Sequence, residues 1–262
     1  SWFSHKAETV KPYYYQVYLA EHDVVAELAP TERAAAFRLT YPEKEMSYLV
    51  VDAYSGGHVE VLPDRNMIAG YSTANHGGVA GNFRNWFVVI SDTPFETRTT
   101  DDHIAMVGFK TAKGQKVNLR VASSFISHEQ AEINLKELGD RTLDEIAQAG
   151  RARWNEVLGR IAVEDGNLDN LRTFYSCLYR SVLFPRDLSE INADGERVHY
   201  SPYDGAVHKG YLFADTGFWD TFRCLFPLLN LVYPDESVKM QEGLVNTWKE
   251  SGFLPEWSSP GH

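Results

Sequence analysis

Residues 117–147 decide the fold, because the hydrophobic period of the chain changes within this stretch. It opens with VNLRV at residues 117–121, where apolar and polar side chains alternate as in a strand with one buried face. It closes with TLDEIA at residues 142–147, where Thr142 and Glu145 fit a capping box and apolar residues recur at helical spacing. The sequence therefore predicts β structure up to about residue 140 and α structure beyond it.

Upstream of this switch, short runs rich in Val, Tyr, Phe and Thr recur between turn signals such as Ser55-Gly56-Gly57 and His76-Gly77-Gly78. Strands are predicted over residues 13–19, 35–40, 47–53, 58–62, 85–91, 104–109 and 117–125. Short strands at regular spacing, with no long helix between them, indicate an antiparallel β-sandwich.

Downstream of the switch the apolar spacing is helical. Helices are predicted over residues 142–161, 168–184, 218–232 and 236–250. Residues 187–214, between the second and third helices, are rich in Gly, Asp, His and Tyr, and we expect a long functional or mobile loop there. Cys177 and Cys224 fall within helical apolar patterns, which favours buried free thiols over a disulfide.

Composition restricts the possible partners. The 262-residue chain carries 25 Lys and Arg against 36 Asp and Glu, a net charge of −11, and 13% of its residues are aromatic. The aromatic content excludes a disordered chain. The acidity argues against nucleic acid as a partner, because phosphate binding needs concentrated Lys and Arg. No run of about 18 apolar residues is present, so no membrane-spanning segment is expected.

Two motifs carry weak chemical signals. The Gly-rich residues 77–81 precede no helix start, so phosphate binding is disfavoured there. His199 and His208 could contribute to a metal site, but neither a nearby Cys nor an HxxxH spacing supports one. Ordinary polar loop histidines are the favoured interpretation.

Two clusters combine acidic and aromatic residues, FWDTFR at residues 218–223 and GFLPEW at residues 252–257. Such pairs suit sugar binding, because a pyranose packs its apolar face on an indole while a carboxylate accepts hydrogen bonds from its hydroxyls. Alternatively, the first cluster is a helix start with Trp219 and Phe222 in the core, and Trp257 is a packing anchor beside a solvated Glu256. Composition alone leaves both interpretations open.

At these residues the chain resembles glycoside hydrolase family 92, the calcium-dependent exo-acting α-mannosidases. The resemblance runs in order along essentially the whole chain. It rests on Phe3-Ser4-His5-Lys6 with Tyr14-x-Val-Tyr-Leu, Trp154-Asn155, Phe174-Tyr175-x-x-Leu178-Tyr179, Leu183-x-Pro185, Asp204-Gly205-x-Val207-His208, Trp219-Asp220-Thr221-Phe222-Arg223 and Leu254-Pro255-x-Trp257. Each motif is weak alone, but their order and spacing are specific.

The resemblance implies an α+β chain of two domains. Residues 1–139 would form part of an antiparallel β-sandwich, residues 140–165 a helical linker, and residues 166–262 the first helices of an (α/α)6 toroid. The chain would be an internal fragment of a longer enzyme, with cut edges at Ser1 and at Pro260-Gly261-His262. The catalytic acid and base, and the ligands of an assisting Ca²⁺ ion, would lie outside it, so the fragment alone is expected to be inactive.

The resemblance also implies the substrate and the site. The whole enzyme would hydrolyse mannose-rich glycans, such as N-glycans, at α-1,2 or related linkages with inversion. It would act outside the cytoplasm, either in the periplasm or as a secreted or cell-surface protein. Trp219 and Asp220 would contact the non-reducing mannose. Further pocket residues would be Arg223, Glu256, Trp257 and His208. The alternative is a non-catalytic carbohydrate-binding module whose sandwich binds sugar and whose helices are a spacer.

Overall fold

The computed structural model describes residues 2–54, 56–75 and 78–258. Three expectations fall wholly or partly outside these residues: the cut edges at Ser1 and 260–262, the turns that contain Ser55 and His76, and the beginning of the Gly-rich run at Gly77. The chain divides into two compact units, residues 1–74 with 84–154, and residues 75–83 with 155–262. The break at residue 154 falls inside the predicted 140–165 linker, and the three-part division stays a prediction.

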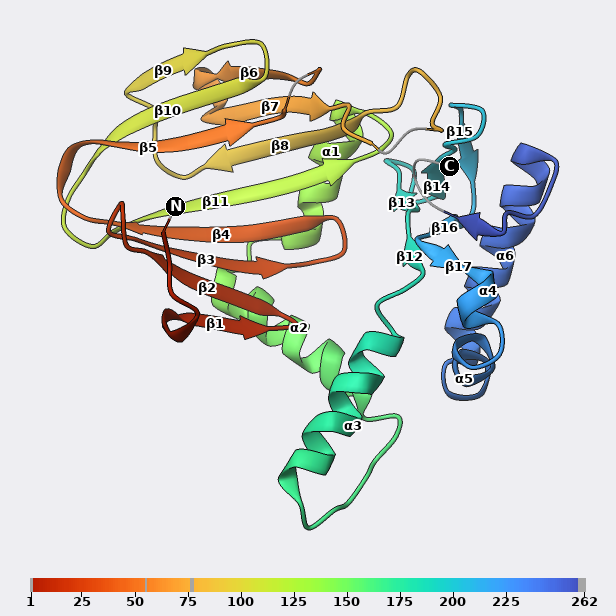
Figure 1. The fold of residues 1–262 in the computed structure, drawn as a ribbon. Coiled ribbons are helices and arrows are strands. Elements are labelled where there is room, and N and C mark those ends of the chain that lie inside the picture. The colour runs from red at the N-terminus through yellow and green to blue at the C-terminus, as the bar shows by residue number, and fades with distance from the viewer. Residues whose placement is uncertain (1, 55, 76–77, 259–262) are drawn as a thin grey trace. The chain divides into compact units, whose positions relative to one another are not determined.

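The first unit is built on one large antiparallel sheet (Figure 1). Its strands, in spatial order, are β1 (Glu8–Lys11), β2 (Tyr14–Leu19), β3 (Val24–Pro30), β4 (Ala34–Tyr41), β11 (Gln115–Ser124), β8 (Asn85–Ser91), β7 (Met67–Ser72) and β6 (His58–Leu62). A three-stranded antiparallel sheet contains β5 (Lys44–Asp52), β10 (Ile104–Thr111) and β9 (Thr97–Thr100). Three-residue 3-10 turns lie at His5–Ala7 and Pro63–Arg65.

A core between these two sheets confirms the predicted sandwich. Phe109 and Val107 of β10 are fully buried with Val117 and Leu119 of β11. The alternation at residues 117–121 therefore places Val117 and Leu119 in this core, while Asn118 between them stays exposed. Burial of such apolar side chains contributes about 1.5–3 kcal/mol each.

Helices cover the opposite face of the large sheet. They are α1 (His128–Asn134), the 3-10 turn Leu135–Leu138 and α2 (Leu143–Leu158). The Thr142–Glu145 capping box forms as predicted: the Thr142 N–H donates to Glu145 at 2.8 Å, and the Glu145 N–H donates to Thr142 Oγ1 at 3.3 Å. Ala34 and Ala36 of β4 pack in this layer, and their small side chains allow close approach of the helices.

A charged network ties the same face of the sheet to α2. Arg38 of β4 donates two hydrogen bonds to Glu27 of β3, at 2.7 and 2.6 Å, and two to Asp144 of α2, at 2.9 and 3.1 Å. The Tyr14 hydroxyl donates to Glu27 at 2.8 Å. Each carboxylate thus receives a bidentate guanidinium contact, a strong and directional form of ion pair.

The second unit is mainly helical. Its helices are α3 (Leu168–Ser181), α4 (Phe218–Thr221), α5 (Leu225–Val232) and α6 (Pro234–Ser251). The last two pack around a core that includes Leu229, Tyr233 and Met240. The single helix predicted over residues 218–232 is wrong, because the chain breaks between α4 and α5 at residues 222–224. None of the described helices is long and apolar enough to cross a bilayer.

Residues 187–214 are not the predicted long loop. The segment contains β13 (Glu190–Ile191), β14 (Arg197–Tyr200) and β15 (Val207–Lys209), which form a small antiparallel sheet. Next to it, β12 (Arg186–Asp187) pairs with β16 (Phe213–Ala214). The strands are so short that their alternation was hidden among turn residues.

Residues 78–83, in the connection between β7 and β8, belong to the second unit. Asn82 Nδ2 donates to the Gly205 carbonyl at 2.8 Å, and the Tyr200 hydroxyl donates to Asn82 Oδ1 at 3.0 Å. A Cβ at Gly205, whose φ is +76°, would collide with Asn82 and Ala80. The glycine therefore permits both the turn and the close approach.

The cysteine prediction needs correction. Cys177 and Cys224 are both free, as favoured, but both are exposed rather than buried. Cys177 lies on the outer face of α3, and Cys224 lies at the N-cap of α5, where the predicted helix is interrupted. The apolar periodicity of residues 218–232 had suggested burial of Cys224, and the break between α4 and α5 removes that reason.

Candidate functional site

A two-stranded antiparallel bridge joins the two acid–aromatic clusters. β17 (Thr216–Gly217) pairs with β18 (Trp257–Ser258), so that Gly217 faces Trp257. The Asp215 N–H donates to the Ser258 carbonyl at 2.7 Å, and the Phe218 N–H donates to the Glu256 carbonyl at 3.1 Å. The bridge therefore brings the two clusters, distant in sequence, side by side, and we call Trp219, Asp220, Glu256 and Trp257 the acid–indole site.

The first cluster begins a helix, as one interpretation proposed, but Trp219 and Phe222 are not core. Gly217 is the N-cap of α4, and Asp220 lies in the first turn, where the positive end of the helix dipole favours a carboxylate. Trp219 is 77% exposed and Phe222 is 51% exposed, so the core assignment of both is wrong. Only Phe218 turns inward, and its ring stacks on that of Phe226 at 5.3 Å.

The second cluster follows the end of α6. Gly252 ends this helix with φ +85°, a left-handed conformation that glycine adopts without strain. Glu256 is exposed, as expected of a solvated carboxylate, and Trp257 is 55% exposed. Trp257 nevertheless packs against Gly217, so it is both an anchor and an accessible ring.

Arg223 does not hold the Asp220 carboxylate. Its guanidinium lies over the Phe222 ring, 5.0 Å from the centroid. Within the described part of the chain, no hydrogen bond or ion pair joins it to Asp220. Arg223 is exposed and close in sequence to the acid–indole site, and its role as a pocket neighbour stays a prediction.

His208 lies in the β13–β14–β15 sheet rather than in the acid–indole site. Its Nε2 is 2.8 Å from Asp204 Oδ2, and Asp204 Oδ1 accepts from the Ala206 N–H at 2.9 Å. Burial raises the pKa of Asp204, but the Ala206 N–H and His208 outweigh it and hold that pKa below its ordinary value. Among the residues that the structure describes, no hydrogen bond, ion pair or ring contact joins His208 to the four residues of the acid–indole site, so its role as a pocket neighbour stays a prediction.

His199 is not a loop histidine. It pairs with His208 across β14 and β15, and it is fully buried. Its Nε2 lies 2.9 Å from Oε1 of Glu250, near the end of α6, and its Nδ1 lies 2.9 Å from the Gly210 carbonyl. This pair joins the small sheet to the helix that leads into the second cluster.

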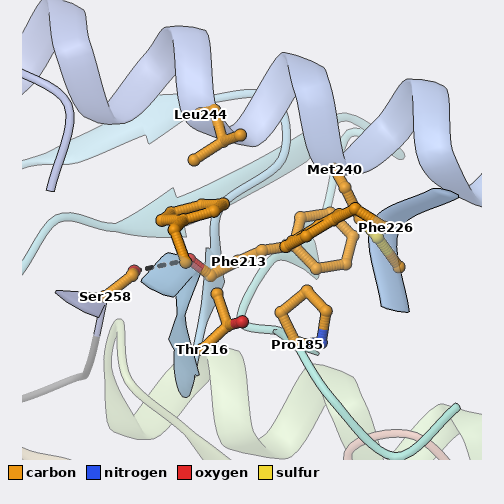
Figure 2. Close-up of a pocket in the computed structure, with 8 residues that line it drawn as sticks. Pro185, Phe213, Thr216, Phe226, Met240, Leu244 and Ser258 are labelled. Atoms are coloured by element: carbon orange, nitrogen blue, oxygen red, sulfur yellow. Dashed lines mark hydrogen bonds between the residues drawn. The ribbon is translucent and has the colours of Figure 1, made fainter. Parts of the chain in front are cut away.

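An apolar pocket adjoins the bridge (Figure 2). Its lining residues are Pro185, Phe213, Thr216, Phe218, Phe226, Met240, Leu244 and Ser258. Ser258 Oγ donates to the Phe213 carbonyl at 3.0 Å, whereas the buried Thr216 Oγ1 has no hydrogen-bond partner in the described chain. The sequence offered no signal for this pocket, because its residues come from segments that only the fold brings together.

Sequence reasoning also missed Asp215, which turns the chain from β16 into β17. Its φ is +65°, a left-handed conformation that is uncommon for a residue other than glycine. Its carboxylate accepts a short hydrogen bond from Arg186 Nε of β12. The turn sets the direction in which β17 and then α4 leave the β12–β16 pair.

The described residues do not fit a calcium site. Among them, no group of three or more His, Cys, Asp and Glu side chains converges to hold a metal ion. Calcium prefers six to eight oxygen ligands. We therefore assign no step of a reaction to calcium in this part of the chain.

Exposed indoles and carboxylates suit the apolar face and the hydroxyls of a sugar, and comparison with known proteins gives the class as glycoside hydrolase. Residues 1–136 match the N-terminal domain of glycosyl hydrolase family 92, and residues 130–262 match the catalytic domain of that family. The chain belongs to glycosyl hydrolase family 92.

Three relatives illustrate the similarity. A solved family GH92 inverting mannosidase from Bacteroides thetaiotaomicron is 42% identical to this chain, with a TM-score of 0.94. The match covers 99% of this chain and 37% of the mannosidase. A GH92 α-mannosidase from the same organism, solved with mannoimidazole, shares the fold at 24% identity and a TM-score of 0.85. The match covers 100% of this chain and 38% of that α-mannosidase. An uncharacterized secreted glycosidase of Arthroderma benhamiae is 25% identical over 53% of this chain and 23% of its own. The chain thus spans less than two fifths of each of these relatives.

Proposed function

We propose that the acid–indole site binds the terminal mannose of a mannose-rich glycan, in an enzyme that removes this sugar by inverting hydrolysis. The observation that carries the proposal is the β17–β18 bridge, which brings two exposed indoles and two exposed carboxylates together. The family membership and the inverting mannosidase at 42% identity support the sugar and the reaction.

In this proposal Trp219 and Asp220 contact the sugar directly. An exposed indole offers a flat apolar face to the C–H face of the pyranose. A carboxylate accepts hydrogen bonds from two adjacent hydroxyls, and charge-assisted bonds of this kind contribute about 1.5–3 kcal/mol each. In the same proposal, Glu256, Trp257, Arg223 and His208 are the neighbouring residues of the pocket.

We assign neither Asp220 nor Glu256 as the catalytic acid or base. Inverting hydrolysis needs an acid that protonates the leaving oxygen and a base that takes a proton from the attacking water, with carboxyl groups about 6.5–9.5 Å apart. The α-1,2 or related linkage, the calcium ion and export from the cytoplasm belong to the whole enzyme. The name of the secreted relative supports export.

Methyl α-mannoside titrated into the 262-residue chain by calorimetry tests the binding. We expect saturable binding that Asp220→Asn abolishes. Asp235→Asn is the matched control, because Asp235 is also an exposed aspartate in the first turn of a helix, α6. Binding unaffected by Asp220→Asn would overturn the assignment.

Turnover in the whole enzyme tests the reaction. We expect Asp220→Asn to lower kcat/KM for α-1,2-mannobiose about 100-fold, equivalent to the loss of about 2.7 kcal/mol. We expect EDTA to abolish the activity, and full activity after chelation would contradict calcium dependence. The 262-residue chain is expected to release no mannose by itself.

The same experiments separate the hydrolase from a carbohydrate-binding module. The match of residues 130–262 to the catalytic domain of the family favours the hydrolase. A module would bind mannoside through residues 1–139, and Asp220→Asn would leave that binding intact.

A further inference from the structure

Position 217 requires a glycine because a side chain there would collide with the Trp257 ring. Its backbone conformation does not require one. Its φ of −102° and ψ of 116° are ordinary for any residue. A Cβ at this position would lie 3.2 Å from Cδ2 of Trp257 and closer still to Cε3 and Cζ3. The six-membered ring of the indole therefore covers the Cα of Gly217, and alanine cannot be accommodated unless the ring moves.

The backbone around this contact leaves Trp257 little freedom. The hydrogen bonds from the Asp215 N–H to Ser258 and from the Phe218 N–H to Glu256 hold β18 on both sides of Trp257. Ser258 Oγ also donates to the Phe213 carbonyl at 3.0 Å. The indole is thus supported by Gly217 on one side, while 55% of the residue stays accessible.

A ring fixed in this way is suited to stacking. Binding a ligand on a mobile side chain costs rotamer freedom, and a preorganised ring avoids most of that loss. A pyranose presents a continuous apolar C–H face that matches the area of an indole.

We propose that Gly217 is a positioning residue that holds the Trp257 indole as a stacking platform for a pyranoside. The ligand class rests on the proposed mannoside site, whereas the positioning rests only on the contact between Gly217 and Trp257. Because Gly217 has no side chain, the Trp257 indole can lie directly on its Cα, and this contact determines the position of the ring.

A double-mutant cycle in the 262-residue chain tests this. The variants are Gly217→Ala, Trp257→Ala and the double variant, each titrated with methyl α-mannoside. Gly217→Ala is expected to raise Kd about tenfold, which corresponds to one lost aromatic contact. In the Trp257→Ala background the same change is expected to have no effect, because it acts through the ring. Gly166→Ala is the matched control, since no heavy atom lies within 4 Å of its Cβ position.

The indole N–H resonance of Trp257, assigned by its loss in Trp257→Phe, provides a readout independent of sugar. It is expected to shift in Gly217→Ala and to stay unchanged in Gly166→Ala. Wild-type Kd together with an unmoved resonance in Gly217→Ala would overturn the inference. A shifted resonance in a chain that binds no mannoside would instead overturn the proposed function and the ligand class, and leave the positioning supported. If Gly217→Ala fails to fold while the double variant folds, the clash with the ring is established directly.

Discussion

His199 and Glu250 form a buried hydrogen-bonded pair that joins β14 to α6. Nε2 of His199 lies 2.9 Å from Oε1 of Glu250, and Nδ1 lies 2.9 Å from the Gly210 carbonyl, which can only accept a hydrogen bond. The His199 side chain is 0% exposed and that of Glu250 is 6% exposed. Oε2 of Glu250 has no partner within the described residues, so His199 provides the main compensation for its burial.

Removing His199 should therefore destabilise the second unit strongly. His199→Leu leaves the Glu250 carboxylate buried and unpaired, and we expect a loss of about 3 kcal/mol in unfolding free energy. The double variant His199→Leu/Glu250→Leu should lose less, because no uncompensated charge remains. Urea denaturation measures the unfolding free energy of the single and the double variant. His208→Leu is the control, since its pair with Asp204 is over one third exposed and should contribute less than about 1 kcal/mol. Equal losses in the single and double variants would contradict this account.

The Glu27–Arg38–Asp144 network should make the first unit sensitive to acid. The Arg38 guanidinium lowers the pKa of Glu27, against the effect of burial and with help from Tyr14, and it lowers the pKa of Asp144. A lowered pKa in the folded state contributes stability above the unfolded value, and this is lost as the pH falls through the folded value. Stability should therefore decline below about pH 4.5, near the ordinary carboxyl values.

Urea midpoints between pH 7 and pH 3 measure this dependence. Glu27→Gln should flatten the decline, whereas Glu60→Gln, at an exposed glutamate of β6, should leave it unchanged. Arg38→Met should cost about 2 kcal/mol at pH 7. That is less than for a fully buried pair, because 16% of the Arg38 side chain is exposed. If stability declined equally with falling pH in the wild type and in Glu27→Gln, Glu27 would not be a source of the acid sensitivity.

The two paired residues Thr216 and Ser258 should respond oppositely to loss of their hydroxyls. Thr216 Oγ1 is buried without a partner among the described residues, so Thr216→Val keeps the shape and should raise the unfolding free energy by up to about 1 kcal/mol. Ser258→Ala removes the bond to the Phe213 carbonyl and should lower it by about 1 kcal/mol. Thermal unfolding of Thr216→Val and Ser258→Ala measures these opposite changes in stability. Destabilisation by Thr216→Val would show that its hydroxyl is satisfied.

Asp215 should tolerate glycine better than alanine, the reverse of the usual order. At φ +65° an alanine carries a penalty of about 1–2 kcal/mol that glycine avoids. Both substitutions remove the ion pair with Arg186 equally, so the difference in Tm between Asp215→Gly and Asp215→Ala isolates the backbone contribution. Asp215→Asn, which tolerates the left-handed region, should fall between them. A more stable Asp215→Ala would contradict a left-handed conformation at this residue.

Predictability from the sequence differed between the two units. Strands with one buried face, such as the one around Val117, were found because their side chains alternate. The strand Met67–Ser72 was missed because residues 67–70 are buried on both faces of the sheet, so no alternation marks it. In the second unit α6 was anticipated by its periodicity, whereas the helix break near Cys224 was hidden by a continuous apolar run.

The candidate site was predicted in its parts and not in its assembly. Trp219, Asp220, Glu256 and Trp257 were selected because their chemistry suits a sugar. Gly217 and Asp215 were not predicted. No local sequence pattern marks a glycine that is needed for close packing against a distant ring, or an aspartate with a positive φ. His208, placed near the site by the resemblance, is held in a different sheet by Asp204.

Features that depend on neighbours along the chain can be predicted from the amino-acid sequence: the change of hydrophobic period near residue 140, the Thr142–Glu145 cap and the two acid–aromatic clusters. The tertiary structure alone decided that these clusters meet, since the β17–β18 bridge needs α5 and α6 to return the chain to Gly217. It also decided that His199 is buried against Glu250. Such contacts join residues far apart in sequence, and their energies arise only when the intervening segments have packed.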